Sequence, residues 1–103
     1  MTKKRKPVYD LAAFKAAFDS VEKLATALKS AAAIGFGRRD IVETIQTVQP
    51  KHFYQSMTSY ADHLIWQDVY HVPAAVGVLY IKFTADVLTE FLLLSFKGKG
   101  DDS

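Results

Sequence analysis

The sequence predicts a single α+β domain, in which short helices from the first half cover one face of an antiparallel sheet formed by the second half. Apolar residues recur at helical spacing between positions 11 and 48. From position 52 onward, aromatic and β-branched residues gather in short runs that turn-forming residues separate. With 103 residues, the chain suffices for one domain, 1–103, and leaves no room for a second.

Composition excludes several classes of protein. The chain has no cysteine, which excludes disulfides and thiolate metal sites and fits a cytoplasmic protein. The most apolar region, 76–96, contains Lys82, Asp86 and Glu90, so we do not expect it to span a membrane. A net charge of +2 is too small to indicate nucleic-acid binding by itself.

The two ends of the chain are expected to be flexible. Residues 1–8 carry four consecutive basic side chains and are typical of a solvated tail. The alternative is an arm that binds phosphates without regard to base sequence. Residues 98–103 are expected to form a flexible C-terminus.

The first half of the chain predicts two or three helices. Leu11, Phe14 and Phe18 share one helical face, with Asp10 as the expected N-cap. A second apolar set between 24 and 32 extends this helix or forms a new one.

Glycines and a proline are expected to delimit the helices that follow. Gly35 and Gly37 should end the second apolar set. Asp40 should begin a short helix, because Glu43 stands three residues later as in a capping box. Pro50 should close that helix.

The second half predicts four strands, at 53–59, 64–71, 76–84 and 88–97. Residues 61–63, Pro73 and residues 85–86 separate them, and connections this short favour antiparallel neighbours.

Alternation along the strands predicts which side chains the helices leave uncovered. Two apolar sets are expected to face the helices: Leu79, Ile81 and Phe83, and Leu92, Leu94 and Phe96. The opposite face would then carry Tyr80, Lys82, Ser95 and Lys97. In the strand 64–71 the odd-numbered and the even-numbered side chains are equally apolar. The sequence therefore does not decide whether Gln67 faces the helices or the uncovered side of the sheet.

An open sheet face with lysines and tyrosine suits RNA, because ammonium groups bind phosphates and aromatic rings stack on unpaired bases. The same groups could cleave the strand by general acid–base chemistry, and His63 beside Asp62 is a further candidate base. The plain alternatives are ordinary solubilising side chains and a loop histidine. The three histidines lack the spacing of a zinc site, and we expect neither metal nor cofactor.

A specific resemblance covers the C-terminal half. The run 53–70, FYQSMTSYADHLIWQDVY, resembles the signature of the MqsR (motility quorum-sensing regulator) toxin family. Residues 78–82 and 94–97 are similar to the last two strands of that family. The likeness is looser upstream, where 27–35 and 40–45 resemble its two short helices.

The resemblance implies a RelE-like fold and a metal-independent, ribosome-independent endoribonuclease. Such a toxin cuts messenger RNA at GC-containing triplets such as GCU and thereby inhibits translation and growth. It further implies a cognate MqsA-like antitoxin with a zinc-binding N-terminal domain and a helix-turn-helix C-terminal domain. Operator DNA would be reached only through that antitoxin. The resemblance also implies a short strand near 21–24.

Individual residues carry over from the resemblance. Gln67, Tyr80 and Lys97 match the family's catalytic glutamine, tyrosine and C-terminal lysine. The resemblance implies an RNA-binding role for the following positions: Tyr54, Gln55 and Lys82. Gln55 departs from the family, which has a lysine there, and a neutral amide cannot supply positive charge. The interval from Tyr80 to Lys97 is slightly longer than in the family.

Three functions remain open from the sequence. The first is an active mRNA interferase. The second is a catalytically weakened RNA-binding relative, which the glutamine at position 55 permits. The third is a regulatory protein that mainly binds its antitoxin. Growth arrest on induction separates the first from the others.

Overall fold

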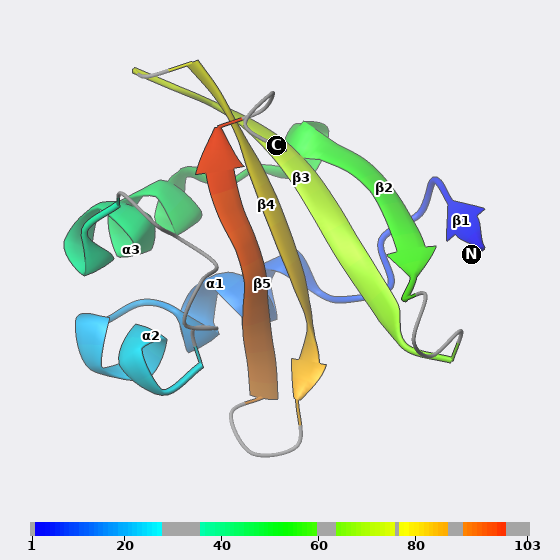
Figure 1. The fold of residues 1–103 in the computed structure, drawn as a ribbon, viewed down its shortest axis with the longest axis horizontal. Coiled ribbons are helices and arrows are strands. Elements are labelled where there is room, and N and C mark those ends of the chain that lie inside the picture. Colours follow the sequence, from blue (N-terminus) through cyan, green and yellow to red (C-terminus); the bar gives the residue numbers. More distant parts are fainter. Residues whose placement is uncertain (1, 28–35, 60–63, 76, 87–89, 99–103) are drawn as a thin grey trace.

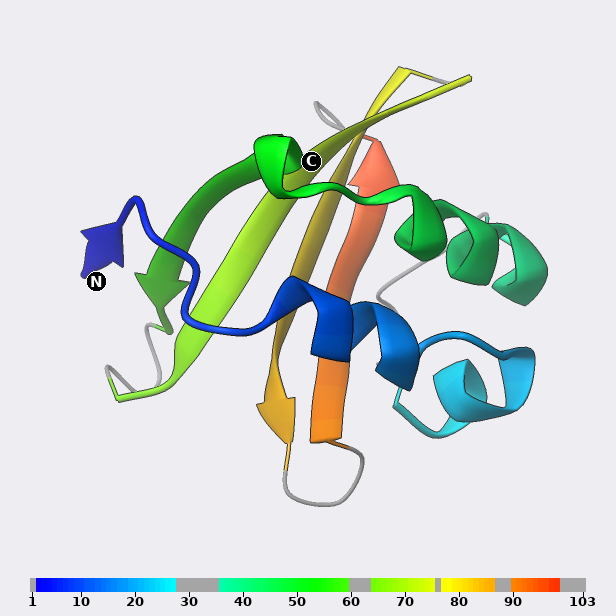
Figure 2. The ribbon, with the colours of Figure 1, turned by 180° about the vertical axis from the view of Figure 1, so that it is seen from behind.

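The structure, a computed structural model, describes residues 2–27, 36–59, 64–75, 77–86 and 90–98. It has two layers, with helices on one face of a strongly twisted five-stranded antiparallel sheet (Figures 1 and 2). This architecture confirms the predicted α+β class and is consistent with a RelE-like fold. None of the helices in these residues is long and apolar enough to cross a membrane.

The strands lie in the sheet in the order in which they occur in the sequence. They are β1 (Lys3–Lys4), β2 (Phe53–Thr58), β3 (Trp66–Ala74), β4 (Gly77–Asp86) and β5 (Glu90–Gly98). Each pairs antiparallel with the next. The short connections that predicted antiparallel neighbours are therefore confirmed.

Three helices precede the main strands: α1 (Leu11–Ala17), α2 (Val21–Ala27) and α3 (Arg38–Thr47). The single 3₁₀ turn of the described residues, η1 (Pro50–His52), leads into β2. Asp10 is the N-cap of α1, as predicted, and its carboxylate accepts a hydrogen bond from the Ala12 amide at 3.0 Å.

The strand that the resemblance implies near 21–24 is wrong, because these residues begin α2. Ser20 starts that helix. Its carbonyl accepts from the Leu24 amide at 3.1 Å, and its hydroxyl accepts from the Lys23 amide at 3.3 Å. The first bond closes the first turn of the helix, and the second gives a partner to an amide that has none within the helix, so both favour the helix.

The predicted start of the third helix is also wrong. Gly37 is its N-cap, in an extended conformation, and its carbonyl accepts from the Ile41 amide at 3.1 Å. Asp40 therefore lies within the first turn, and Glu43 forms no capping box with it. The helix ends before Pro50, which begins η1 instead. Gly35 lies outside the described residues.

An aromatic core joins the two layers. Phe14 of α1 stacks on Phe83 of β4, with ring centroids 3.6 Å apart and planes 6° from parallel. Around this pair lie further fully buried side chains from both layers: Phe18, Leu24, Ile41, Ile45, Tyr70, Ile81, Leu93 and Phe96. The predicted apolar set of β4 (Leu79, Ile81 and Phe83) is buried as expected.

Strand β5 departs from the alternation that we predicted. Lys82 pairs with Ser95 but Phe83 pairs with Leu93, so Leu94 is the extra residue of a β-bulge. The bulge shifts the alternation by one residue. Phe91 and Leu93 are therefore buried, and the predicted burial of Leu92 and Leu94 is wrong, whereas Phe96 is buried as predicted.

Pro73 does not separate two strands, because it lies inside β3 and pairs with Val78. The chain reverses one pair further on, after Ala74, which pairs with Gly77. Gly77 has a φ of +115°, a conformation that glycine adopts without strain. Proline is tolerated here because it stands at the end of the ladder.

The basic N-terminal segment joins the sheet, in contrast to the flexible tail expected for 1–8. Lys3 and Lys4 pair with Met57 and Ser56 of β2. The reason is Asp68, which is fully buried and accepts hydrogen bonds from the Val8 and Tyr9 amides at 2.9–3.1 Å. At the other end of the chain, Gly98 completes β5, and 99–103 lie outside the described residues.

Candidate functional site

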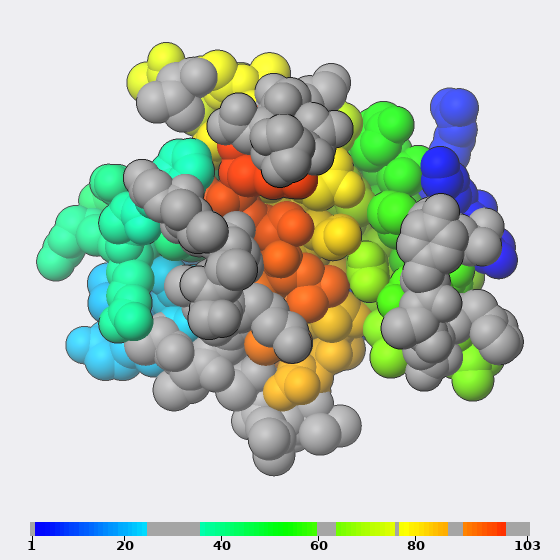
Figure 3. Space-filling view, in the orientation of Figure 1, coloured from blue at the N-terminus to red at the C-terminus, as the bar shows by residue number. Residues whose placement is uncertain are grey.

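The face of the sheet opposite the helices carries the predicted site residues. On β3, Tyr70 and Val72 belong to the core beneath the helices, so the alternate residues Gln67, Val69 and His71 lie on the other face. The direction of Gln67, which the sequence left open, is thereby settled. We call this surface the open face; Figure 3 looks onto it, with β4 and β5 in the middle of the view.

One row of side chains crosses the open face from β2 to β5, and we call it the aromatic row: Tyr54, His71, Tyr80 and Lys97. The Tyr54 ring stacks on His71 at 4.2 Å and 18°, and His71 lies 5.6 Å from the Tyr80 ring. The Lys97 ammonium stands 5.6 Å from the Tyr80 ring centroid.

Tyr80 and Lys97 are direct cross-strand partners, so both can reach one phosphate. The bulge at Leu94 makes this possible despite the longer interval between them. It adds a residue before Lys97 without moving Lys97 away from Tyr80. The prediction that both project from the uncovered face is consistent with this register.

A second row lies alongside the first, with Gln55, Val69, Lys82 and Ser95 in register. Val69, at the centre of this row, is fully buried. Burial lowers the pKa of Lys82, and the nearby Lys97 charge lowers it further. Both effects disfavour the positively charged form of Lys82. A phosphate bound nearby would stabilise that charged form.

Tyr80 is affected in the opposite direction. Partial burial raises the pKa of Tyr80, with a smaller contribution from Tyr54. At neutral pH its phenol thus keeps its proton and can donate it. The open face combines a proton donor with two ammonium groups, Lys82 and Lys97.

Gln67 shares the open face but lies apart from the aromatic row. It stands four residues before His71 on β3, about 13 Å away at a rise of ~3.3 Å per residue. Lys82 lies between them, opposite Val69. The structure therefore brings Tyr54, Tyr80 and Lys97 together in one row and leaves Gln67 outside that row, further along β3.

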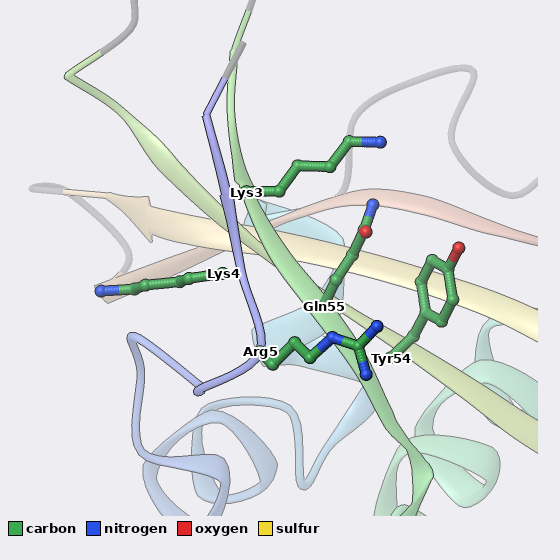
Figure 4. A pocket seen from close by; sticks show the side chains of 5 residues that line it. All are labelled: Lys3, Lys4, Arg5, Tyr54 and Gln55. Carbon is green, nitrogen blue, oxygen red and sulfur yellow. The ribbon is translucent and has the colours of Figure 1, made fainter.

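A hollow of about 400 Å³ lies beside the aromatic row and is lined by Lys3, Lys4, Arg5, Tyr54 and Gln55. Figure 4 shows the side chains of Lys3, Arg5, Tyr54 and Gln55 on one side of the sheet, whereas that of Lys4 points the other way. The Lys4 ammonium lies 4.5 Å from the centroid of the Trp66 ring. We call this site the basic hollow. Tyr54 belongs to both the hollow and the row.

His71 is the site residue that the sequence analysis missed. It could have been found if the sequence had shown which side chains of β3 face the helices. Because Tyr70 faces them, His71 lies on the open face, where it pairs with Tyr80. His63, the histidine that we singled out instead, lies outside the described residues. Within the described part of the chain, no three His, Cys, Asp or Glu side chains gather as metal ligands would.

Comparison with known proteins agrees with this geometry. The family model of the motility quorum-sensing regulator, toxin of MqsA, matches residues 6–98, which include α1 to α3 and β2 to β5. The mRNA interferase toxin MqsR of Escherichia coli (strain K12) is 39% identical over 74 residues, covering 72% of this chain and 74% of that relative. The matched region contains both rows of the open face, and the chain belongs to the motility quorum-sensing regulator (MqsR) toxin family.

Proposed function

We propose that this protein is an mRNA interferase, the toxin of a type II toxin–antitoxin pair, and that it cleaves RNA on the open face. The name of the E. coli relative and the family membership support the activity. The observation that carries the location is the direct pairing of Tyr80 with Lys97, a phenol and an ammonium group side by side on the face of the sheet that none of the described helices covers.

The open face suits single-stranded RNA. Tyr54 is about half exposed, at 52%, and His71 covers one side of its ring, which leaves the other side for a base. Lys82 and Lys97 attract the backbone without selecting a sequence. Stacking and charge thus fix the strand across the aromatic row.

Cleavage follows from attack of a ribose 2′-hydroxyl on the adjacent phosphorus. The O2′–P bond forms, the P–O5′ bond breaks, and the products are a 2′,3′-cyclic phosphate and a 5′-hydroxyl. One group must remove the 2′ proton, another must protonate the departing O5′, and cations must stabilise the added negative charge.

We assign these tasks by the state of each group. Tyr80, whose raised pKa keeps it protonated, donates the proton to O5′. Lys97 stabilises the phosphate from the neighbouring strand. Lys82 is mostly an ammonium ion, but its lowered pKa increases the fraction of molecules in which it is a neutral amine, and this amine accepts the proton of the 2′-hydroxyl. Gln67, further along β3, holds the adjoining nucleotide.

The finer features of the proposal come from the family. We propose cleavage at GC-containing triplets such as GCU, in the cytoplasm, without a metal ion. We also propose inhibition by an MqsA-like antitoxin with a zinc-binding N-terminal domain and a helix-turn-helix domain, through which alone operator DNA is reached. Co-purification with the product of a neighbouring reading frame of that organisation tests the pairing.

Primer extension on a defined RNA, with purified protein and a chelator, tests the activity. The wild type should cut at few positions, and the Tyr80→Phe/Lys97→Ala double variant should not cut while its circular dichroism spectrum stays unchanged. Lys23→Ala, on the helical layer, removes the same charge and should remain active. Full activity of the double variant would refute the assigned site.

A second candidate function is RNA binding without efficient cleavage. Gln55 favours it, because an amide next to the aromatic row replaces the positive charge that the family has there. RNA binding by the wild type with no cleavage on any substrate would select this function.

A further inference from the structure

We propose that the basic hollow binds a phosphate of the RNA that flanks the scissile one, and that Lys3 and Arg5 are its ligands. The inference rests on the proposed RNA substrate and adds a second binding site to it. The hollow lies on the β1–β2 edge of the sheet, whereas Tyr80 and Lys97 lie on β4 and β5.

The charge of the hollow indicates an anion. Among the described residues that line it, the side chains of Lys3 and Arg5 lie on the same side of the sheet as those of Tyr54 and Gln55, and none of the described lining residues is a carboxylate. Among the described residues, neither Lys3 nor Arg5 forms an ion pair, whereas Lys23 on the helical layer pairs with Asp19 at 3.0 Å. Two cations without a counter-ion in a concave site are suited to phosphate oxygens.

The hollow is held in place by the fold. Thr2 and Thr58 exchange two hydrogen bonds of 2.8 Å ahead of β1, and Asp68 accepts from the Val8 and Tyr9 amides behind it. Lys3 and Lys4 pair with β2 between these two anchors. The backbone that carries Lys3 and Arg5 is thus ordered before RNA arrives, which reduces the entropy lost on binding.

The distance across the sheet favours two separate phosphates over one shared phosphate. Strands lie about 4.8 Å apart, so β1 stands three spacings, or about 14 Å, from Tyr80 on β4. That span between backbones is much longer than one phosphate group. Tyr54, which lines the hollow and stacks on His71, connects the two sites and places a base between the two phosphates.

RNA is favoured over the antitoxin as the occupant, because Tyr54 and Gln55 continue the hollow into the aromatic row. A strand bound at Tyr80 and Lys97 therefore meets Lys3 and Arg5 without leaving the open face. An antitoxin contact at the hollow alone would be a different result of the test below.

The test measures cleavage of an RNA with one cleavage site, and binding of the same RNA with a 2′-deoxy sugar at that site, which removes the nucleophile. Lys3→Ala and Arg5→Ala should each raise KM and Kd about tenfold and leave kcat unchanged. Each should also reduce the slope of log K against log salt by about 0.7, the value for one phosphate contact on a single strand.

The chain offers a matched control and a rescue. Lys4→Ala removes the same charge from the same strand, but its side chain lies over Trp66 on the other face, so KM and the salt slope should stay nearly unchanged. Gln55→Lys adds a cation inside the hollow and should restore binding to the Arg5→Ala variant. Rescue also shows that the variant is folded.

Substrates trimmed one nucleotide at a time should lose the effect of Arg5→Ala once the flanking phosphate is gone. Three results would overturn the inference. They are an equal rise in KM for Lys4→Ala and Arg5→Ala, no rise in KM for either variant, and a fall in kcat without a change in KM. A loss of antitoxin affinity with unchanged RNA binding would also overturn it. A wild type that binds but never cuts RNA would refute the proposed activity and leave the binding test of the hollow intact.

Discussion

Replacing Asp68 by alanine is expected to destabilise the domain by about 4 kcal/mol. Its carboxylate is fully buried and has three donors: the amides of Val8 and Tyr9, and the hydroxyl of Ser56. Hydrogen bonds to a charged group contribute about 1.5–3 kcal/mol each, so even the low end of that range gives this sum for three. A domain of this size has only about 5–15 kcal/mol in total.

Two milder variants make the magnitude measurable. Asp68→Asn keeps the volume and one oxygen acceptor and should cost about 2 kcal/mol. Ser56→Ala removes one of the three donors and should cost about 1.5 kcal/mol. Urea unfolding followed by the fluorescence of Trp66, the chain's one tryptophan, gives each difference at constant m.

Amide hydrogen exchange locates the effect. The Val8 and Tyr9 amides should lose protection in Asp68→Asn, whereas amides of α3 should keep theirs. If Asp68→Ala costs less than about 1 kcal/mol, or if these two amides exchange as in the wild type, the carboxylate does not anchor the N-terminal segment.

Three further predictions concern the core, a turn and the open face. Phe14→Ala removes the ring stacked on Phe83 and should cost about 3–5 kcal/mol in urea unfolding; a cost below 1 would contradict the packing. Gly77→Ala should cost about 1–3 kcal/mol, because φ is +115° although the new methyl meets nothing within 4 Å, and its thermal midpoint checks this. Lys82→Met should raise the midpoint at pH 7. Since burial lowers the pKa of Lys82 in the folded state, wild-type stability rises with pH toward the unfolded pKa, and the difference should vanish near pH 10.5. A difference independent of pH would contradict that sign.

The features that could be predicted from the sequence depend on neighbours along the chain. The Asp10 cap needs only the amide two residues later, and the alternation of β4 needs only regular pleating. Both were therefore predicted correctly. Tyr80 and Lys82 were placed on one face by the same alternation.

The features that were missed depend on a partner strand. The bulge at Leu94 is visible only in the pairing of β5 with β4, and nothing in the local pattern of leucines distinguishes it. The two-residue strand β1 forms because β2 and Asp68 bind it, although its own sequence is typical of a tail. His71 stayed hidden because the parity of β3 follows from the burial of Tyr70 against the helices.

The bulge on β5 bears on how this hairpin tolerates changes in length during evolution. A residue gained or lost between Glu90 and Leu94 shifts only the pairing between the bulge and the β4–β5 turn, since Lys97 pairs with Tyr80 on the other side of the bulge. Relatives can therefore differ in the spacing of these two residues while keeping them adjacent, and an alignment based on linear spacing alone would misplace the lysine.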